Sequence, residues 1–144
     1  MANVSPFLWF EGNMQEAVKF YASVFKDARI VSMSPAMATF ELLGQKFLAL
    51  NAHPHDKFND AISFFIECDT QADVDYYWEK LADGGGERQC GWVKDRFGLS
   101  WQVIPNALGR YLMDKDRDKA NRVMQAMLKM KKIVIADLDA AANG

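Results

Sequence analysis

The sequence predicts an α+β protein made of two tandem βαβββ modules followed by C-terminal helices. Two observations support this prediction: the chain matches itself over a long stretch, and each copy begins as a short aromatic strand followed by an amphipathic helix. The 144 residues, half of them apolar, are enough for one ordinary domain with a core.

The internal repeat aligns FLWFEGNMQEAVKFYASVF (7–25) with SFFIECDTQADVDYYWEKL (63–81). Apolar positions coincide throughout, so both stretches can bury the same faces. Four positions are identical: Glu11 with Glu67, Gln15 with Gln71, Val18 with Val74, and Tyr21 with Tyr77.

The first copy begins with the strand PFLWF, which is aromatic enough for a buried strand. Asn13 and Glu16 then have the spacing of an N-cap and a capping box, and helical periodicity continues to Phe25. Three further strands follow, with a turn at Gly44–Gln45 between the last two: RIVSMS, ATFELL and KFLALNA.

The second copy repeats this order, from AISFFIE to a helix capped by Thr70 with Asp73. Gly84–Gly86 come after that helix and predict a C-cap and a turn, because a phosphate-binding loop needs its glycines before a helix. A short strand near Glu87, then QCGWVKD and LSWQVIP, complete the module, with a turn at Asp95–Gly98.

Beyond Pro105 the pattern is helical, in NALGRYLMD and in KANRVMQAMLKMKK, and IVIADLDAAA adds a turn or two. We therefore expect a single domain over 1–144. Its first module spans 5–52, its second spans 60–105, and a C-terminal helical extension spans 106–144.

Charge and hydropathy limit the partners. A net charge of −2 gives no positive field for nucleic acid, and no stretch approaches the length of a membrane span. The N-terminus has no basic region before its apolar run, so we expect a cytoplasmic protein. Cys68 and Cys90 stand alone, which predicts packed thiols in a reducing compartment.

Most of the chain resembles the PhnB-like branch of the vicinal oxygen chelate superfamily, which includes glyoxalase I, bleomycin-resistance proteins and dioxygenases. The matching stretches are PFLWFEGNMQEAVKFYASVF, FLALNAHPHDKFNDAISFFIECDTQADVDYYWEKL, QCGWVKDRFGLSWQVIP and VMQAMLKMKKIVIADLDAA. The resemblance implies that the two modules form a curved, half-open mixed sheet with a cavity on its concave face, and that the protein is a homodimer. The connection over 31–39 is shorter than is usual in that family.

The resemblance also gives positions for metal ligands, and here they hold Pro6, Leu48, Ile62 and Gln102. Divalent transition ions prefer imidazole, thiolate or carboxylate ligands, which these positions do not offer. We therefore predict no metal and no other cofactor. His53 and His55, the only two histidines, flank Pro54 and are interpreted as loop residues, with a ligand contact left open for His55.

Strand alternation then predicts an apolar wall around the ligand, with Gln102 as a polar anchor. The residues predicted to bind ligand are Leu8, Phe10, Leu48, His55, Phe64 and Gln102. The same apolar residues could instead simply pack a core. Catalytic residues stay unknown: His55, Asp95, Glu41 and Tyr21 are candidates, but no nucleophile–base pair is recognisable from their spacing.

The leading hypothesis is a homodimer that binds a small, largely apolar molecule without a divalent metal. One alternative is an enzyme, either a glyoxalase-type or dioxygenase-type lyase or isomerase, or the demethylubiquinone methyltransferase that gives relatives their label. The chain has no glycine-rich strand-to-helix turn for an adenosyl cofactor, which counts against the second. Another alternative is a structural or regulatory dimer that acts through its C-terminal helices.

Overall fold

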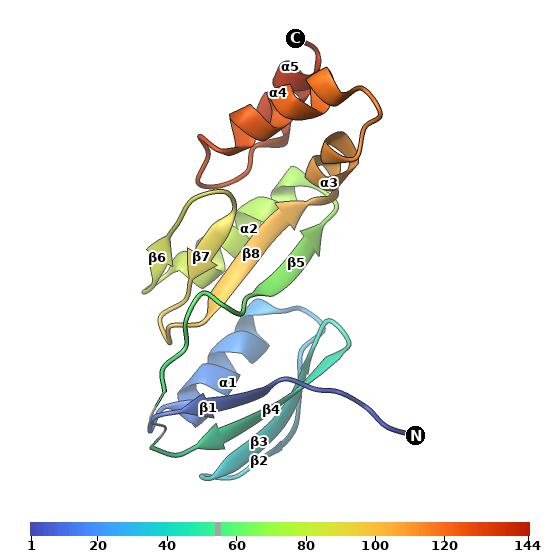
Figure 1. Ribbon diagram of the computed structural model, residues 1–144. Coiled ribbons are helices and arrows are strands. Elements are labelled where there is room, and N and C mark those ends of the chain that lie inside the picture. Colours follow the sequence, from blue (N-terminus) through green and yellow to red (C-terminus); the bar gives the residue numbers. More distant parts are fainter. Residues whose placement is uncertain (54–55) are drawn as a thin grey trace. The chain divides into compact units, whose positions relative to one another are not determined.

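The computed structural model describes residues 1–53 and 56–144 (Figure 1). The chain divides into two compact units, Met1–Lys57 and Phe58–Gly144. His55 lies outside the described residues, so its predicted ligand contact stays a prediction.

The first unit folds in the order β-α-β-β-β and forms one four-stranded sheet with strand order β1-β4-β3-β2. Strand β1 runs parallel to β4, and the other two pairings are antiparallel. The elements are β1 (Phe7–Phe10), α1 (Met14–Val24), β2 (Arg29–Met33), β3 (Met37–Leu42) and β4 (Gln45–Asn51).

The second unit repeats this topology, with strand order β5-β8-β7-β6 and one parallel pair, β5 with β8. Its first elements are β5 (Phe64–Cys68), α2 (Gln71–Ala82), β6 (Gly86–Glu87), β7 (Trp92–Lys94) and β8 (Ser100–Pro105). The predicted α+β fold of two βαβββ modules is confirmed, and the uncertain strand near Glu87 is present as β6.

Each sheet buries one face under the helix of its own unit (Figure 1). In the first unit Tyr21 of α1 is fully buried and stacks on Phe40 of β3, with ring centroids 6.3 Å apart. In the second, Trp78 and Leu81 of α2 are buried with Val93 and Val103 of the sheet. Apolar residues at helical spacing meet apolar residues at strand spacing, as amphipathic patterning requires.

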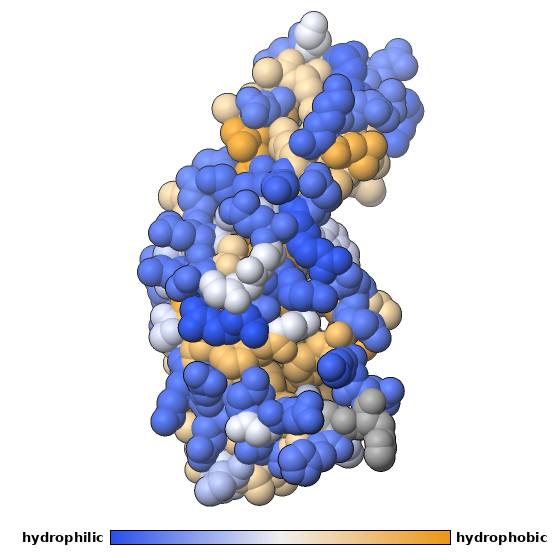
Figure 2. All heavy atoms as spheres, turned by 90° about the vertical axis from the view of Figure 1, so that its left-hand side faces the viewer, coloured by the Kyte–Doolittle hydropathy of each residue, from blue (hydrophilic) through white to orange (hydrophobic). Residues whose placement is uncertain are grey.

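Three helices complete the second unit: α3 (Asn106–Leu112), α4 (Arg117–Met127) and α5 (Ile135–Ala142). They enclose a small core of their own, which includes Ile104, Val123, Ile133 and Leu138. Hydrophobic side chains also show among the hydrophilic ones on the surface of this C-terminal part, at the top of Figure 2. Exposed examples are Met113, Met124 and Leu128.

The segment between α4 and α5 fastens these helices to the sheet. The backbone N–H groups of Cys90 and Gly91 donate to the carbonyls of Met130 and Lys131, at 2.8 Å each. The Gln71 side chain donates to the carbonyl of Ile133 and accepts from the N–H of Ile135 at 2.7 Å, close to the start of α5. The C-terminal helices are therefore hydrogen-bonded to the second module.

Local signals were confirmed in part. Thr70 caps α2 as predicted, accepting from the N–H of Asp73 at 3.1 Å. The predicted side-chain cap of Asn13 is wrong, because its backbone is not extended (φ −121°, ψ 22°) and its side chain makes no cap hydrogen bond. The turn between β3 and β4 uses Leu43 and Gly44, one residue earlier than predicted, with φ of 49° and 82°.

No helix among residues 1–53 and 56–144 is long and apolar enough to cross a membrane.

Candidate functional site

Each sheet has a second face, which its own helix does not cover and which we call the open face. Residues paired directly across neighbouring strands point to the same face, so the register identifies the open-face residues. In the first unit, Trp9 pairs with Leu50, and Leu50 pairs with Met37. Trp9 and Met37 are 48% and 45% exposed, so this row is apolar and largely uncovered.

The predicted ligand wall of the first module needs correction. Leu8 and Phe10 are 7% and 2% exposed and lie on the face that α1 covers, whereas Leu48 pairs with Phe7 on the open face. The prediction that Leu8 and Phe10 share a face with Leu48 is therefore wrong. An error of one residue in counting along a strand moves every side chain to the opposite face.

The same error affects the second module. Phe64 pairs with the buried Trp101, and their ring centroids are 5.4 Å apart, so Phe64 belongs to the helix-covered side. Gln102 pairs with Phe65 instead, which is 55% exposed. Phe64 and Gln102 therefore do not share a face, and Phe65 is the aromatic neighbour of Gln102.

A row of four side chains crosses the open face of the second sheet. Phe65 of β5, Gln102 of β8 and Trp92 of β7 are paired in register. Beyond β6, the N–H of Arg88 donates to the carbonyl of Trp92 at 2.9 Å and extends the row by one residue. Two aromatic rings thus flank an amide, with a guanidinium at the edge of the sheet.

A polar segment before β5 contacts the same face. The Asp60 carboxylate accepts from both terminal nitrogens of Arg88, with Nη1 to Oδ1 at 3.0 Å, and from Ser100 Oγ at 2.6 Å. Gln102 Nε2 donates to Ser63 Oγ at 2.9 Å. The segment 58–63 is therefore held to the open face by its side chains.

The surroundings of Asp60 stabilise its ionised form. Hydrogen bonds from Arg88 and Ser100, together with the charges of Arg88 and Lys94, lower the pKa of the Asp60 carboxyl from 3.8 to about 2. An opposite charge and donated hydrogen bonds both stabilise the ionised form of a carboxyl group. Asp60 therefore carries a stabilised negative charge at this corner of the sheet.

A pocket of about 450 Å³ lies at this edge, lined by Asp60, Glu87, Arg88, Gln89 and Trp92. Ligand pockets of proteins typically have volumes in the range of a few hundred Å³, so a small molecule fits by size. The Glu87 carboxylate accepts from Trp78 Nε1 of α2 at 2.9 Å. Trp92 and the Asp60–Arg88 pair are thus its apolar and polar walls.

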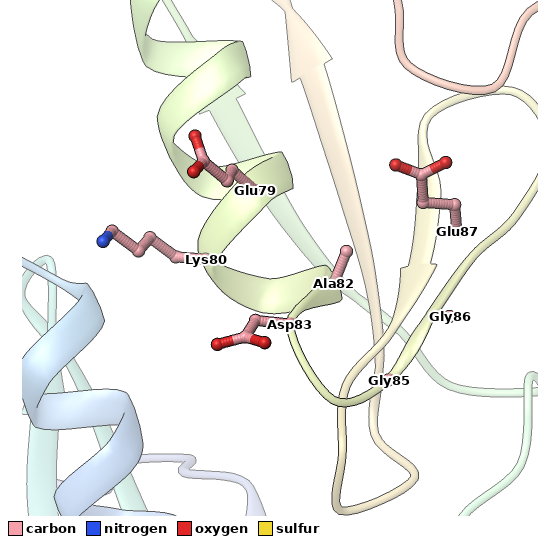
Figure 3. Close-up of a pocket in the computed structure, with 7 residues that line it drawn as sticks. All are labelled: Glu79, Lys80, Ala82, Asp83, Gly85, Gly86 and Glu87. Atoms are coloured by element: carbon pink, nitrogen blue, oxygen red, sulfur yellow. The ribbon is translucent and has the colours of Figure 1, made fainter.

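A larger pocket, of about 610 Å³, lies at the end of α2 (Figure 3). Its charged side chains do not converge: Lys80 and Asp83 point away from Glu87, which lies across the opening on β6. Asp83 also pairs with Arg96 at 3.2 Å. We therefore do not assign a ligand to it.

The catalytic candidates fall in separate places. Asp95 is buried, and its carboxylate accepts from the N–H groups of Phe97 and Leu99 and from Trp101 Nε1. Asp95 therefore stabilises the turn at Asp95–Gly98 that the sequence predicted. Tyr21 belongs to the core under the first sheet, and Glu41 pairs with Arg29 at 3.1 Å on a partly exposed surface.

The resemblance to the vicinal oxygen chelate superfamily implies a divalent metal, and the donor atoms of the described residues decide whether such an ion fits. Among residues 1–53 and 56–144, no group of three His, Cys, Asp or Glu side chains is placed to hold an ion. Gln102, the one side chain with donor atoms at the four family positions, donates from its amide to Ser63. The residues described do not fit such a metal.

Sequence reasoning missed Asp60, Phe65 and Arg88. The signal for Phe65 was Glu67, two residues on: a charged residue in a strand faces solvent, and Phe65 shares its face. Asp60 and Arg88 carried no local signal, because they meet from positions 28 residues apart.

Comparison with known proteins gives a consistent family. A family model described as 3-demethylubiquinone-9 3-methyltransferase matches residues 2–104, and so does not include the C-terminal stretch that also resembled the family. A Bacillus cereus structure, described as a putative 3-demethylubiquinone-9 3-methyltransferase and PhnB protein, is 31% identical with a TM-score of 0.67. The match covers 72% of this chain and 99% of that one.

More distant structures share the fold. A Pseudomonas aeruginosa protein is 22% identical with a TM-score of 0.61, and the match covers 73% of this chain and 98% of that one. The fosfomycin resistance protein FosX of Mesorhizobium loti is 16% identical with a TM-score of 0.53, and the match covers 70% of this chain and 89% of that one. No curated protein matches the chain.

Proposed function

Because the chain belongs to the PhnB-like, 3-demethylubiquinone-9 3-methyltransferase family of the vicinal oxygen chelate superfamily, we propose that it binds a small, largely apolar molecule. The binding surface is the open face of the second sheet, around Phe65, Gln102 and Trp92. The family description itself fixes no substrate for this chain, since one scaffold serves unrelated chemistries.

The observation that supports this proposal is the cross-strand row. Phe65 is 55% exposed on a sheet face, and an aromatic ring gains free energy when a ligand removes it from water. Gln102, between the two rings, has an amide oxygen and a second N–H beyond its bond to Ser63. Apolar walls with a few polar anchors are typical of small-molecule sites.

We propose that binding needs no divalent metal, because the described His, Cys, Asp and Glu side chains form no group that could hold one. We also propose that the protein is a homodimer in a cytoplasmic setting. The apolar row on the first sheet supports dimerisation, since exposed apolar clusters often mark interaction surfaces. Light scattering of the purified chain measures the oligomeric state directly.

The methyltransferase label implies an adenosyl cofactor, and the described residues do not fit one. Such a site needs a glycine-rich turn between a strand and a helix N-terminus, in a mainly parallel sheet. Here β5 is joined to α2 through Asp69 and Thr70, and each sheet has one parallel pair. Calorimetric binding of S-adenosylmethionine at micromolar affinity would contradict this conclusion.

The test is a thermal-shift and calorimetric screen of the full chain against neutral aromatic and aliphatic compounds. We expect Trp92→Ala and Gln102→Ala to weaken any hit by about tenfold, a loss of roughly 1.4 kcal/mol per site. Leu128→Ala is the control, because Leu128 is 50% exposed in the same unit but belongs to none of the strands that form this row. Hits that all three variants bind equally would place the ligand elsewhere.

A further inference from the structure

The Asp60 carboxylate is bound as an organic acid would be. Arg88 donates to both of its oxygens, and Ser100 adds a third donor at 2.6 Å. The two-pronged Arg–carboxylate geometry is the arrangement by which proteins recognise acids, because the guanidinium fork matches the carboxylate. The donors therefore form an acid-binding subsite that the chain itself occupies.

Asp60 reaches this position from a turn near the surface. It lies in a turn stabilised by Asn59, whose side chain accepts from the N–H of Ala61 at 2.9 Å, and not in a strand. Ile62, the large aliphatic residue next to this turn, is 69% exposed and does not anchor it. The Asp60 side chain itself is 42% exposed. The carboxylate thus sits at the surface, where another anion can compete for Arg88.

We propose that the site takes an organic acid with a flat apolar body, whose carboxylate replaces that of Asp60 at Arg88 and Ser100. This inference rests on the proposed function, because the apolar body uses the same row of side chains. Asp60 then acts as an internal competitor that keeps the subsite closed to anions without such a body.

The spacing of the row fits this class of ligand. Strands lie about 4.8 Å apart, so Trp92 and Phe65, two strands from each other, leave about 10 Å between their backbones. Gln102 lies between them and forms the floor. Arg88 follows Trp92 at the edge, so an acid group attached to a flat body over Gln102 points toward the guanidinium.

Two cationic side chains support an anion at this place. Arg88 and Lys94 both act on the Asp60 carboxyl, whereas the Glu87 carboxylate of the same pocket accepts from the neutral Trp78 Nε1 of α2. If Asp60 leaves, Arg88 has no other acceptor among its described side-chain contacts. An incoming carboxylate would restore the pair.

Competition sets the expected size of the effect. A tethered group acts at an effective concentration on the order of millimolar, so removing it strengthens binding of a free acid. We expect Asp60→Ala to tighten binding of 2-naphthoate by about twofold or more, with no change for the neutral 2-naphthylmethanol. Arg88→Gln should weaken naphthoate and leave the neutral compound unaffected.

The experiment is isothermal titration of the full chain with both probes at neutral pH and fixed salt. Asp60→Asn is the second variant, since it keeps the shape of the side chain if Asp60→Ala folds poorly. Asp83→Ala is the matched control, because it breaks the Asp83–Arg96 pair of the same unit without touching this site. The control should bind both probes like the wild-type chain.

The outcomes separate the two proposals. A neutral probe that binds, with naphthoate no tighter in either Asp60 variant than in the wild type, would overturn the inference and leave the proposed function standing. Failure of both probes to bind any variant would overturn the proposed function and the inference with it. A naphthoate-specific gain that Arg88→Gln abolishes supports both.

Discussion

Asp95 offers a sharp test of a structural role for a residue that was also a catalytic candidate. Its carboxylate is 3% exposed and closes the turn between β7 and β8. Oδ1 accepts from the N–H groups of Phe97 and Leu99 at 2.8 and 3.1 Å, and Oδ2 accepts from Trp101 Nε1 at 2.8 Å. The perturbation is Asp95→Asn, which keeps the shape but replaces one oxygen by an amide donor.

The magnitude follows from these contacts. An asparagine oxygen still serves the two backbone N–H groups, so the amide nitrogen faces the indole N–H and one charge-assisted hydrogen bond is lost. We expect a loss of about 2–3 kcal/mol in the free energy of unfolding, and on the order of 5 kcal/mol for Asp95→Ala. Trp101→Phe removes the opposing donor, so the cost of Asp95→Asn should shrink by about 1–2 kcal/mol in that background.

The assay is urea unfolding followed by far-ultraviolet circular dichroism, with the four proteins of the double-mutant cycle measured together. Glu41→Gln is the control, because its partly exposed pair with Arg29 should contribute less than about 1 kcal/mol. A cost below about 0.5 kcal/mol for Asp95→Asn, or no coupling to Trp101, would refute the structural role.

Four further predictions concern other parts of the chain. Gln71→Ala should lower the free energy of unfolding by about 1–3 kcal/mol, because it leaves a backbone N–H and a backbone carbonyl near the start of α5 without their side-chain partner. Hydrogen exchange should show that the loss of protection is concentrated in the C-terminal helices. Leu43→Asn should stabilise the chain by about 1 kcal/mol in the same urea assay, because φ is 49° there and asparagine tolerates this backbone better than leucine. Asp60 has a folded pKa below its unfolded value, so its stabilising effect is present above pH about 4 and disappears as the pH falls toward about 2; the melting temperature of Asp60→Asn should therefore fall less over that interval. Burial raises the pKa of the Cys68 thiol to about 12, so a thiol reagent should modify Cys90 first, and equal labelling of both in mass spectrometry would contradict this.

The fold was predictable because its signals are local. Short aromatic strands, a cap at Thr70 and turns around Gly44 and Gly98 each depend on a few neighbouring residues, and the repeat showed the strands and turns twice. The face on which each strand residue lies was not predicted correctly. The alternation of side chains was counted from Pro6, whereas β1 starts at Phe7. Alternation has a period of two, so this choice placed Leu8 and Phe10 on the wrong side.

The site was less predictable because its polar contacts join distant parts of the chain. Gln102 was identified from its place in β8, but its partner Ser63 lies 39 residues earlier. Arg88 reaches Asp60 across 28 residues, and Ser100 reaches it across 40. No periodicity or spacing rule operates over such separations, so these contacts needed the folded sheet.

The two copies of the module differ in a way that supports placing the proposed site on the second. On the first sheet the cross-strand row is Trp9, Leu50 and Met37, and on the second it is Phe65, Gln102 and Trp92. An apolar row attracts any apolar surface with little discrimination, which suits contact between protein surfaces. An amide between two rings discriminates, since a partner that leaves its donor or acceptor unpaired loses roughly 1–3 kcal/mol. The centre of the row is Leu50 on the first sheet and Gln102 on the second. This one difference makes the first surface suited to association and the second suited to recognition of a particular molecule.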